Sequence, residues 1–370
     1  DEKIVSGARI GKVEETQATQ PVWTFANSRP TISSPDGKNT LTFRGRAQLD
    51  FASFEQDASD MGSSFNCGGA ADPLCDLGAG TVFRRLRFGV EGKFFGDFIY
   101  ELRFDFGGTD TEKQGSINIA RVGYTGIPNF RIQAGAMQPM FTMYDSTSAA
   151  DLNTIERAAV ITTIVGAFGG DNARKGIEAT YMKTDFLYPG DNFLLSAAFT
   201  GQRIGTSHAG NPDDEGTQLL GRIAYRVYSD SDTNIQIGAS GAEILSLSGT
   251  TPGGARNLSF SSTPEIRVNG NTFVSTGNIA ADGGSLYGFE AGANFKNFFL
   301  GAEYYEWEVE RDNSALADPT FSGWYVEGTW ILTGEKKSYK GTATNNNAGV
   351  WASPTPKTPF NPNGGGWGAW

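Results

Sequence analysis

Arginines that recur at every second position are the residues of this 370-residue chain with the clearest chemical potential. Arg44 and Arg46 are spaced in this way, and so are Arg85 and Arg87. A guanidinium group binds the oxygens of a phosphate or a carboxylate through two parallel hydrogen bonds. Because alternate residues of an extended strand share one face, the spacing predicts strands that present rows of anion-binding groups.

Catalytic and metal-binding patterns are weak by comparison. His208 is the only histidine, so the chain lacks the multi-histidine sites of zinc enzymes. Neither a G-x-S-x-G nucleophile turn nor a G-x-x-x-x-G-K-[ST] phosphate loop occurs. Asp213, Asp214 and Glu215 could hold calcium in a loop, and a solvated acidic turn is the alternative. We therefore predict a protein that is not an enzyme and that needs no metal and no cofactor.

The two cysteines, Cys67 and Cys75, lie eight positions apart in a stretch rich in Gly, Ala and Asp. In an exported protein this spacing predicts a small loop disulfide. Two unpaired thiols, or a weak metal site without further ligands, are the alternatives. The chain begins Asp-Glu-Lys without an apolar segment, so we expect that any signal peptide has been removed.

The composition favours an all-β protein with many turns. The chain has 49 Gly and 12% aromatic residues, and an aromatic content this high argues against disorder. No stretch approaches the ~18 consecutive apolar residues of a transmembrane helix. The formal net charge is -11 and no basic domain stands out, so we expect no nucleic acid as a partner.

Apolar and polar residues alternate along most of the chain. Leu41, Phe43 and Leu49 share one face of the first such segment, whereas Arg44 and Arg46 lie on the other. A period of two residues predicts half-buried strands. Twelve strands are predicted, near residues 42–50, 82–94, 98–106, 117–125, 129–137, 173–184, 192–202, 217–229, 233–245, 285–296, 298–310 and 320–333.

The length of these strands and of their connections predicts an antiparallel transmembrane β-barrel. The strands have about 10–14 residues, whereas ordinary strands have ~5–6. Short connections such as 95–97 and 295–297 alternate with long ones such as 138–171 and 246–284, as between the two sides of outer-membrane barrels. A soluble β-protein is the alternative, and it would have to enclose many charged residues.

In such a barrel the apolar face contacts lipid and the polar face lines a lumen. Strand parity turns eleven cationic and eight acidic side chains inward. An excess of basic groups on low-dielectric walls raises the local anion concentration, whereas a mutually neutralising lattice is the alternative. The arginines predicted to line the pore and attract anions are Arg44, Arg46, Arg85, Arg87, Arg103, Arg121, Arg131, Arg174, Arg222 and Arg226.

Six stretches, taken in order, resemble the phosphate-selective porin O/P family of Gram-negative outer membranes. They are FRGRAQLD at 43–50, FRRLRFGVEG at 83–92, ARVGYTG at 120–126, TSAADLNTIER at 147–157, YGFE at 287–290 and ILTGE at 331–335. The resemblance implies an outer-membrane, homotrimeric barrel of 16 strands, of which about 12 are in this chain. The last residues, from Gly368, resemble the start of the thirteenth strand.

The connection 138–171 falls where the family folds a constriction loop into the lumen. Its sequence predicts a short helix over Ser148–Ile164 with Asp151 as a possible cap, and a loop that contacts a trimer partner is the alternative. The predicted constriction residues are Asp145, Asp151, Glu156 and Arg157.

The family's phosphate-binding positions are only partly kept. Arg46, Arg84 and Arg85 match arginine positions, although parity turns only Arg85 of the last two inward. Asp145 and Ala149 stand where lysines would attract phosphate. We therefore expect a porin with at most a mild preference for anions, phosphate among them.

The predicted organisation is an N-terminal periplasmic arm at residues 1–39 and a barrel at 40–370, with a long periplasmic connection at 334–365 that could fold into the mouth. The predicted function is passive diffusion of small hydrophilic or anionic solutes through a channel in outer-membrane lipid. A plugged structural or surface-binding barrel with little conductance is the alternative.

Overall fold

The structure is a computed structural model. It describes residues 20–25, 29–55, 77–109, 111–169, 173–205, 215–249, 256–313, 315–342, 347–359 and 361.

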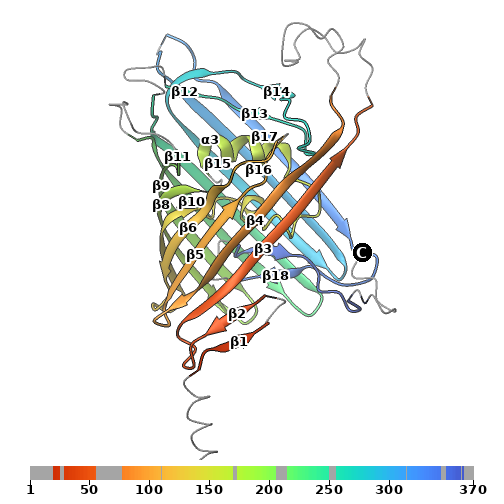
Figure 1. The fold of residues 1–370 in the computed structure, drawn as a ribbon. Coiled ribbons are helices and arrows are strands. Elements are labelled where there is room, and N and C mark those ends of the chain that lie inside the picture. The colour runs from red at the N-terminus through yellow and green to blue at the C-terminus, as the bar shows by residue number, and fades with distance from the viewer. Residues whose placement is uncertain are drawn as a thin grey trace, which may run out of the picture.

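One large antiparallel sheet dominates the fold (Figure 1). Each long strand pairs with its neighbours in sequence, so the sheet is an up-and-down meander from β1 to β17. The twelve long strands are β3 (Thr40–Ala52), β4 (Gly80–Phe94), β5 (Phe98–Asp105), β6 (Ser116–Tyr124), β7 (Phe130–Met137), β8 (Arg174–Thr184), β9 (Asn192–Arg203), β10 (Thr217–Ser229), β11 (Thr233–Ser246), β15 (Ile279–Phe295), β16 (Phe298–Arg311) and β17 (Thr320–Trp330). These strands confirm the twelve predicted from alternation.

Seven short strands and two helices complete the described elements. β1 and β2 extend the sheet beyond β3, and β12 pairs with β15, whereas β13–β14 and β18–β19 form separate two-stranded sheets. Their bounds are β1 (Val22–Thr24), β2 (Thr31–Ser33), β12 (Asn257–Leu258), β13 (Ser261–Ser262), β14 (Val274–Ser275), β18 (Ser338–Lys340), β19 (Val350–Ala352), α2 (Met143–Ser146) and α3 (Ala159–Phe168).

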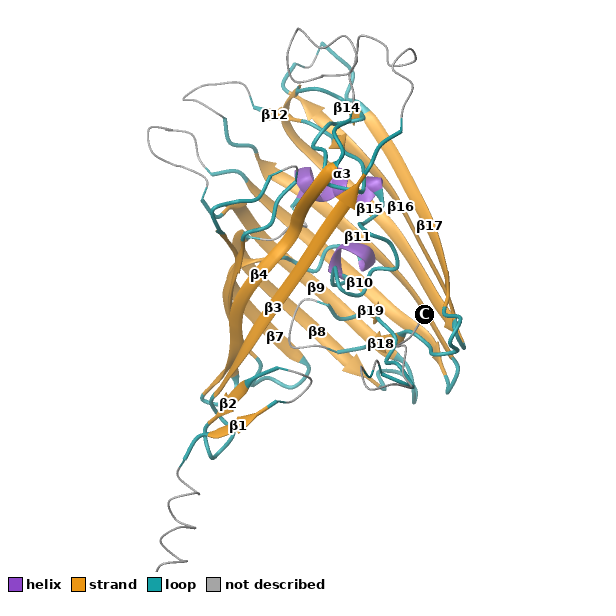
Figure 2. Ribbon diagram, turned by 45° about the vertical axis from the view of Figure 1, so that its right-hand side comes forward, coloured by secondary structure: helices purple, strands orange, loops and turns teal. Residues whose placement is uncertain are grey.

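The sheet curves around an interior but does not close within the described residues. β1 and β17 are its two ends, and Figure 2 shows the gap between the two edges of the curved wall. The predicted antiparallel sheet is therefore confirmed, while the closed barrel of 16 strands stays a prediction.

Tight turns join the strands at the end where β1 and β2 lie. The turn between β4 and β5 has positive φ at Phe95 (53°) and Gly96 (83°). Such turns match the right-handed twist of the strands they join. Strands connected so closely must be antiparallel neighbours, which fixes the register of the wall.

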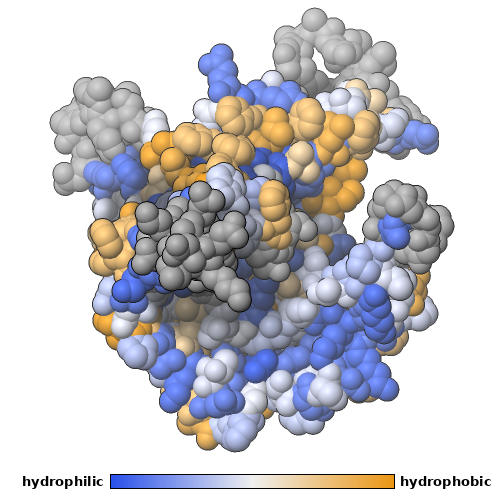
Figure 3. All heavy atoms as spheres, turned by 60° about the horizontal axis from the view of Figure 1, so that its bottom comes forward, coloured by the Kyte–Doolittle hydropathy of each residue, from blue (hydrophilic) through white to orange (hydrophobic). Residues whose placement is uncertain are grey.

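The two faces of the sheet differ as the alternation predicts. Outward-facing Phe51, Phe88, Leu300 and Trp324 are exposed, and Figure 3 shows hydrophobic residues gathered in patches beside hydrophilic ones. The inward face instead carries charged residues that are buried in the interior, such as Arg222. An apolar exterior around a charged interior is the arrangement of a membrane barrel.

Segments between the strands fold into the interior. Ile161, Ile164 and Phe168 of α3 are fully buried and pack with Phe260 of the 246–284 connection and Trp307 of β16. This contact confirms that the connection 138–171 turns inward, and it explains why the loop contains an apolar run.

The predicted helix over Ser148–Ile164 is wrong in its bounds. α2 ends at Ser146 and α3 begins at Ala159, so Asp151 lies in irregular chain between the two helices and caps neither. Thr142 caps α2, because its side chain accepts a hydrogen bond from the backbone N–H of Asp145. The Asp151 carboxylate bonds to residues of the β18–β19 segment instead.

In the described part of the chain, no helix combines the length and the apolar character needed to cross a membrane.

Candidate functional site: an arginine-lined constriction

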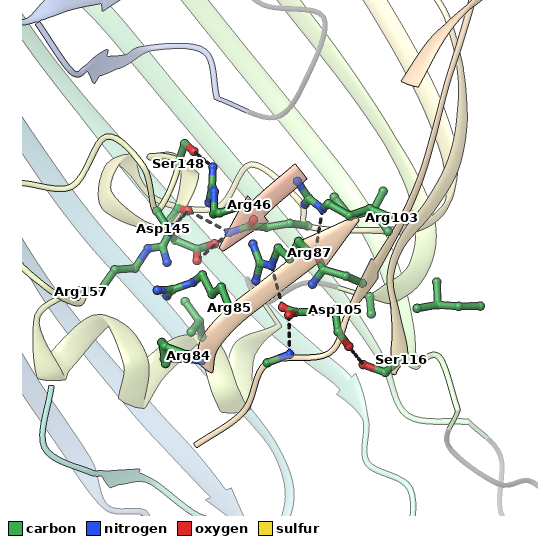
Figure 4. Close-up of a pocket in the computed structure, with 18 of the residues that line it drawn as sticks. Arg46, Arg84, Arg85, Arg87, Arg103, Asp105, Ser116, Asp145, Ser148 and Arg157 are labelled. Carbon is green, nitrogen blue, oxygen red and sulfur yellow. Dashed lines mark hydrogen bonds and ion pairs between the residues drawn. The ribbon is translucent and has the colours of Figure 1, made fainter. Parts of the chain in front are cut away.

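A cavity of about 520 Å³ lies between the wall formed by β3–β6, the constriction loop and the 246–284 connection (Figure 4). Among the described residues, eleven cationic and four acidic side chains line it, so its formal charge is 11 − 4 = +7. The cationic residues are Arg44, Arg46, Arg84, Arg85, Arg87, Arg103, Lys113, Arg121, Arg157, Arg203 and Arg267. The acidic residues are Glu101, Asp105, Asp145 and Glu156.

Strand pairing brings the predicted arginines together. Arg46 of β3 lies directly opposite Arg87 of β4, on the inner face. Like charges opposite one another destabilise a sheet, and here the Arg87 Nε donates to Asp105 Oδ2 at 2.6 Å. Figure 4 shows Arg46, Arg87 and Asp105 around the cavity. The acid on β5 therefore offsets the repulsion between the two arginines.

Glu101 of β5 is the centre of an ion-pair network on this wall. It accepts hydrogen bonds from Arg44 at 3.1 Å and from Arg121 at 2.8 Å, and Arg103 lies 3.4 Å away. The Glu101 side chain is buried, and a buried carboxylate is costly unless cations and hydrogen bonds satisfy it. Three arginines of the cavity are thus held in place and partly neutralised by one acid.

Arg84 also faces inward, so the parity-based expectation for this residue is wrong. Gln48 of β3 lies opposite Arg85, but Leu49 lies opposite Phe83, which leaves Arg84 as an extra residue in β4. Such a β-bulge breaks the strict alternation of faces. The Arg84 Nε consequently reaches Glu156 Oε1 at 2.7 Å.

Glu156 of the constriction loop contacts two adjacent arginines. Arg85 donates to Glu156 Oε2 at 2.8 Å, and the carboxylate is almost fully buried. Burial alone would raise the pKa of Glu156, but the hydrogen bond and charge of Arg85, with the charges of Arg84 and Arg157, outweigh burial and hold it below its ordinary value. Glu156 is therefore ionised at neutral pH.

The other predicted constriction residues have different surroundings. Arg157 donates to the backbone carbonyls of Tyr144 and Asp145, so it closes the loop on itself. The Asp145 side chain is buried and accepts a hydrogen bond from Gln138 at 3.0 Å. Gln138 is a neutral donor, so it fixes the position of this carboxylate and leaves its negative charge in the cavity.

Arg46 and Arg267 of the cavity have no carboxylate partner among the described residues. Arg46 donates only to the Ser148 hydroxyl, at 3.0 Å. Arg267, from the 246–284 connection, has a buried Nε without a hydrogen-bond partner. Burial lowers the pKa of Arg267, and the charge of Arg84 lowers it further. No carboxylate neutralises these two guanidinium groups, so both can bind a solute anion.

Four predicted pore-lining arginines face inward but do not line the cavity. Arg131 is 3.3 Å from Glu178, and Arg222 forms a two-point pair with Glu290. The Arg174 guanidinium donates to Gly166 of α3, and Arg226 lies 4.5 Å from the centre of the Tyr339 ring. Inward-folded segments contact Arg174, Arg222 and Arg226, which strand parity alone does not reveal.

The hairpin of β18 and β19 also occupies the interior, on the side of the tight turns (Figure 2). Val350 and Trp351 are buried, and the Trp351 indole N–H donates to Asn294 of β15 at 3.1 Å. Arg222 donates to the carbonyls of Ala348 and Gly349. The one signal of this hairpin in the sequence is an apolar Val-Trp-Ala run within a polar connection.

Several predicted features lie outside the described residues. They are the cysteines Cys67 and Cys75, the histidine His208, and the acidic residues Asp213 and Asp214. In the part of the chain that the structure does describe, no group of three or more His, Cys, Asp or Glu side chains is arranged to hold a metal ion.

An antiparallel sheet with an apolar exterior, a charged interior and an inward-folded loop defines a porin-type protein of the outer membrane. The sequence model of the phosphate-selective porin O and P family matches residues 44–370. The chain belongs to this family, which confirms the resemblance and the location in the Gram-negative outer membrane. Membership in a porin family favours a channel over an enzyme.

Individual relatives are distant. The chain is 24% identical to Porin O of Pseudomonas aeruginosa over 321 residues, which cover 84% of this chain and 68% of that protein. It is 26% identical to an uncharacterised protein of Caulobacter vibrioides over 353 residues, which cover 94% of this chain and 66% of that protein. The chain thus spans about two thirds of the length of each relative.

Two solved structures of outer-membrane proteins are also similar to the chain. One is OmpT of Vibrio cholerae, with a TM-score of 0.44 and 14% identity over 80% of this chain and 73% of that one. The other is the channel DcaP of Acinetobacter baumannii, with a TM-score of 0.28 and 14% identity over 79% of this chain and 97% of that one.

Proposed function

We propose that the protein forms a water-filled channel for the passive diffusion of small hydrophilic solutes, with a preference for anions. The observation that carries this proposal is the cavity of formal charge +7, in which Arg46 and Arg267 lack a carboxylate partner among the described residues. A cationic constriction between low-dielectric walls concentrates anions and repels cations.

The preference is proposed to be mild and to include phosphate. Guanidinium groups suit the oxygens of phosphate and of carboxylate alike, and the name of the family supports phosphate as a candidate. Glu101, Asp105 and Glu156 neutralise several of the arginines in the cavity. A site whose arginines are only partly neutralised attracts anions without holding them tightly, as conduction requires.

The complete assembly is proposed to be a homotrimer of 16-stranded barrels, in which residues 1–39 form a periplasmic arm. Both ends of the described sheet, at β1 and β17, lack a partner strand. Unpaired backbone groups cost several kcal/mol each in lipid, which supports the proposal that further strands close the wall. The trimer rests on the family resemblance.

A plugged barrel is the second candidate, and the β18–β19 hairpin favours it. Its Val350 and Trp351 fill the interior next to Met143 of α2 and Phe299 of β16. If the hairpin stays in place and leaves no path around it, the barrel conducts little and its loops carry the function.

Electrical recording in planar bilayers separates the two candidates. The channel proposal predicts stepwise conductance increments in KCl, and zero-current potentials in a KCl gradient that show preference for chloride. A plugged barrel gives no increments. Open channels that prefer potassium would contradict the assigned role of the arginine-lined cavity.

A further inference from the structure

The Glu156 carboxylate is bound in the way that a solute anion would be. Arg84 donates to Oε1 at 2.7 Å, and Arg85 contacts both oxygens, at 2.7 Å for Oε1 and at 2.8 Å for Oε2. The β-bulge aims these two neighbouring arginines at one point, although strict alternation would separate them. The result is a fork of guanidinium groups closed by a carboxylate from the loop.

A tethered carboxylate competes strongly with free anions. Attachment to the loop gives Glu156 an effective concentration in the millimolar range or above, and its charge persists at neutral pH because its pKa lies below the ordinary value. A solute anion must displace it to reach Arg84 and Arg85. Arg46 and Arg267, which line the same cavity, need no such displacement.

We propose that Glu156 is a built-in counter-ion that occupies the Arg84–Arg85 anion site and thereby sets the affinity of the channel for its anions. This inference rests on the proposed function and extends it. With Glu156 in place, a solute anion binds weakly in the cavity and dissociates quickly. Without it, two more guanidinium groups bind the anion, so affinity rises while throughput at high anion concentration falls.

The test is the block of chloride current by inorganic phosphate in single channels of the full-length protein. Glu156→Gln keeps the shape of the side chain but removes its charge. We expect the phosphate concentration for half-block to fall by about tenfold, the worth of one additional charge-assisted hydrogen bond. An unchanged half-block concentration would overturn the inference.

Two matched variants exclude simpler explanations. Asp105→Asn removes one negative charge from the same cavity but frees only Arg87. Tyr144→Phe loosens the constriction loop, because it removes the hydrogen bonds of the phenol with Thr154 and Glu327, but it keeps the Glu156 carboxylate and both arginines in the sequence. We expect a clearly smaller effect from both. An equal effect of Asp105→Asn would assign the change to the general charge of the cavity, and an equal effect of Tyr144→Phe would assign it to a looser loop. Either result would overturn the inference.

Glu156→Asp is a second, independent variant in case Glu156→Gln does not insert. It keeps the charge but is one methylene shorter, so it cannot reach both arginines in the same geometry, and a smaller shift toward tighter phosphate block is expected. No shift would contradict the inference. The ion preference of the wild-type channel tests the proposed function separately, because Glu156→Gln can gain affinity whatever that preference is.

Discussion

The Lys340 Nζ lies 3.0 Å from the Asp151 Oδ2, so an ion pair joins the β18–β19 hairpin to the constriction loop. The backbone N–H of Ser353 donates to the other oxygen of this carboxylate at 2.9 Å, and Lys337 donates to the carbonyl of Asp151 at 3.0 Å. Two inward segments that are almost 200 positions apart in the chain therefore form one unit through Asp151.

Substitution of Asp151 should loosen the hairpin. Lys340 is 32% exposed, so the pair contributes about 1 kcal/mol at most, and its loss should raise the population of any hairpin-displaced state by about fivefold. We expect Asp151→Ala channels to visit a higher conductance level more often in single-channel records. Asp318→Ala, which removes an exposed loop contact to the N–H of Arg311, is the control. Identical records for wild type and Asp151→Ala would show that the hairpin does not limit conductance.

Anion preference should depend on the arginines without acid partners more than on the paired ones. A unit charge ~4 Å from an ion in water is worth about 1 kcal/mol, so Arg46→Ala should lower the chloride-to-potassium permeability ratio by up to about fivefold. Arg87→Ala should change the ratio less, because Asp105 already neutralises Arg87. Arg85→Ala with Arg87→Ala should lower it in the same direction. Zero-current potentials measure all three, and Lys296→Ala, in an exposed turn, is the control. A larger effect of Arg87→Ala than of Arg46→Ala would contradict this ranking.

The buried pair of Arg222 and Glu290 should be sensitive to loss of one partner. Both side chains are almost fully buried, and the Nη2–Oε1 distance is 2.7 Å. Arg222→Met leaves an uncompensated carboxylate and should lower the free energy of unfolding by about 3–5 kcal/mol. Arg29→Ala, which breaks an exposed pair with Glu91, should cost about 1 kcal/mol or less. Urea unfolding followed by electrophoretic mobility compares the two variants. Equal urea midpoints for Arg222→Met and Arg29→Ala would mean that the buried Glu290 carboxylate does not depend on Arg222 for stability.

Acid should weaken the clamp between Glu156 and its arginines. The pKa of Glu156 lies below its ordinary value of 4.5 in the folded protein, because Arg85, Arg84 and Arg157 outweigh burial. Its contribution to stability is therefore complete above pH 4.5 and is lost as the pH falls through the lower folded pKa. Thermal stability of wild type and Glu156→Gln, measured against pH, should differ at neutral pH and converge below 4.5. A difference that persists at the lowest pH would refute this assignment.

The wall could be predicted from sequence because the alternation of side chains is long and regular. β16, for example, spans Phe298–Arg311, and the alternation predicted 298–310. Arg84 was misplaced because a β-bulge shifts the register through its pairing with β3, which leaves no mark in the sequence of β4. The position of a strand, and the face on which most of its side chains lie, can thus be predicted from its own sequence. A β-bulge cannot, because it is defined by the pairing of two strands.

The site was predictable only in part. Arg44, Arg46 and Arg87 line the cavity as parity suggests. Arg222 and Arg226 do not, because the space next to them is filled by the β18–β19 segment, whose path no periodic pattern reveals. The β18 and β19 strands have three residues each, which is too short for a period to appear.

The central claim is that water fills the charged side of the sheet while lipid contacts the apolar side, and cysteine accessibility tests this claim directly. Arg46→Cys and Phe88→Cys, each made with Cys67→Ser and Cys75→Ser, are exposed to a water-soluble, negatively charged thiol reagent during recording. We expect that Arg46→Cys reacts and that its chloride current falls, while Phe88→Cys, on the exposed outer face, is protected by lipid. Reaction at position 88 without reaction at position 46 would contradict this claim.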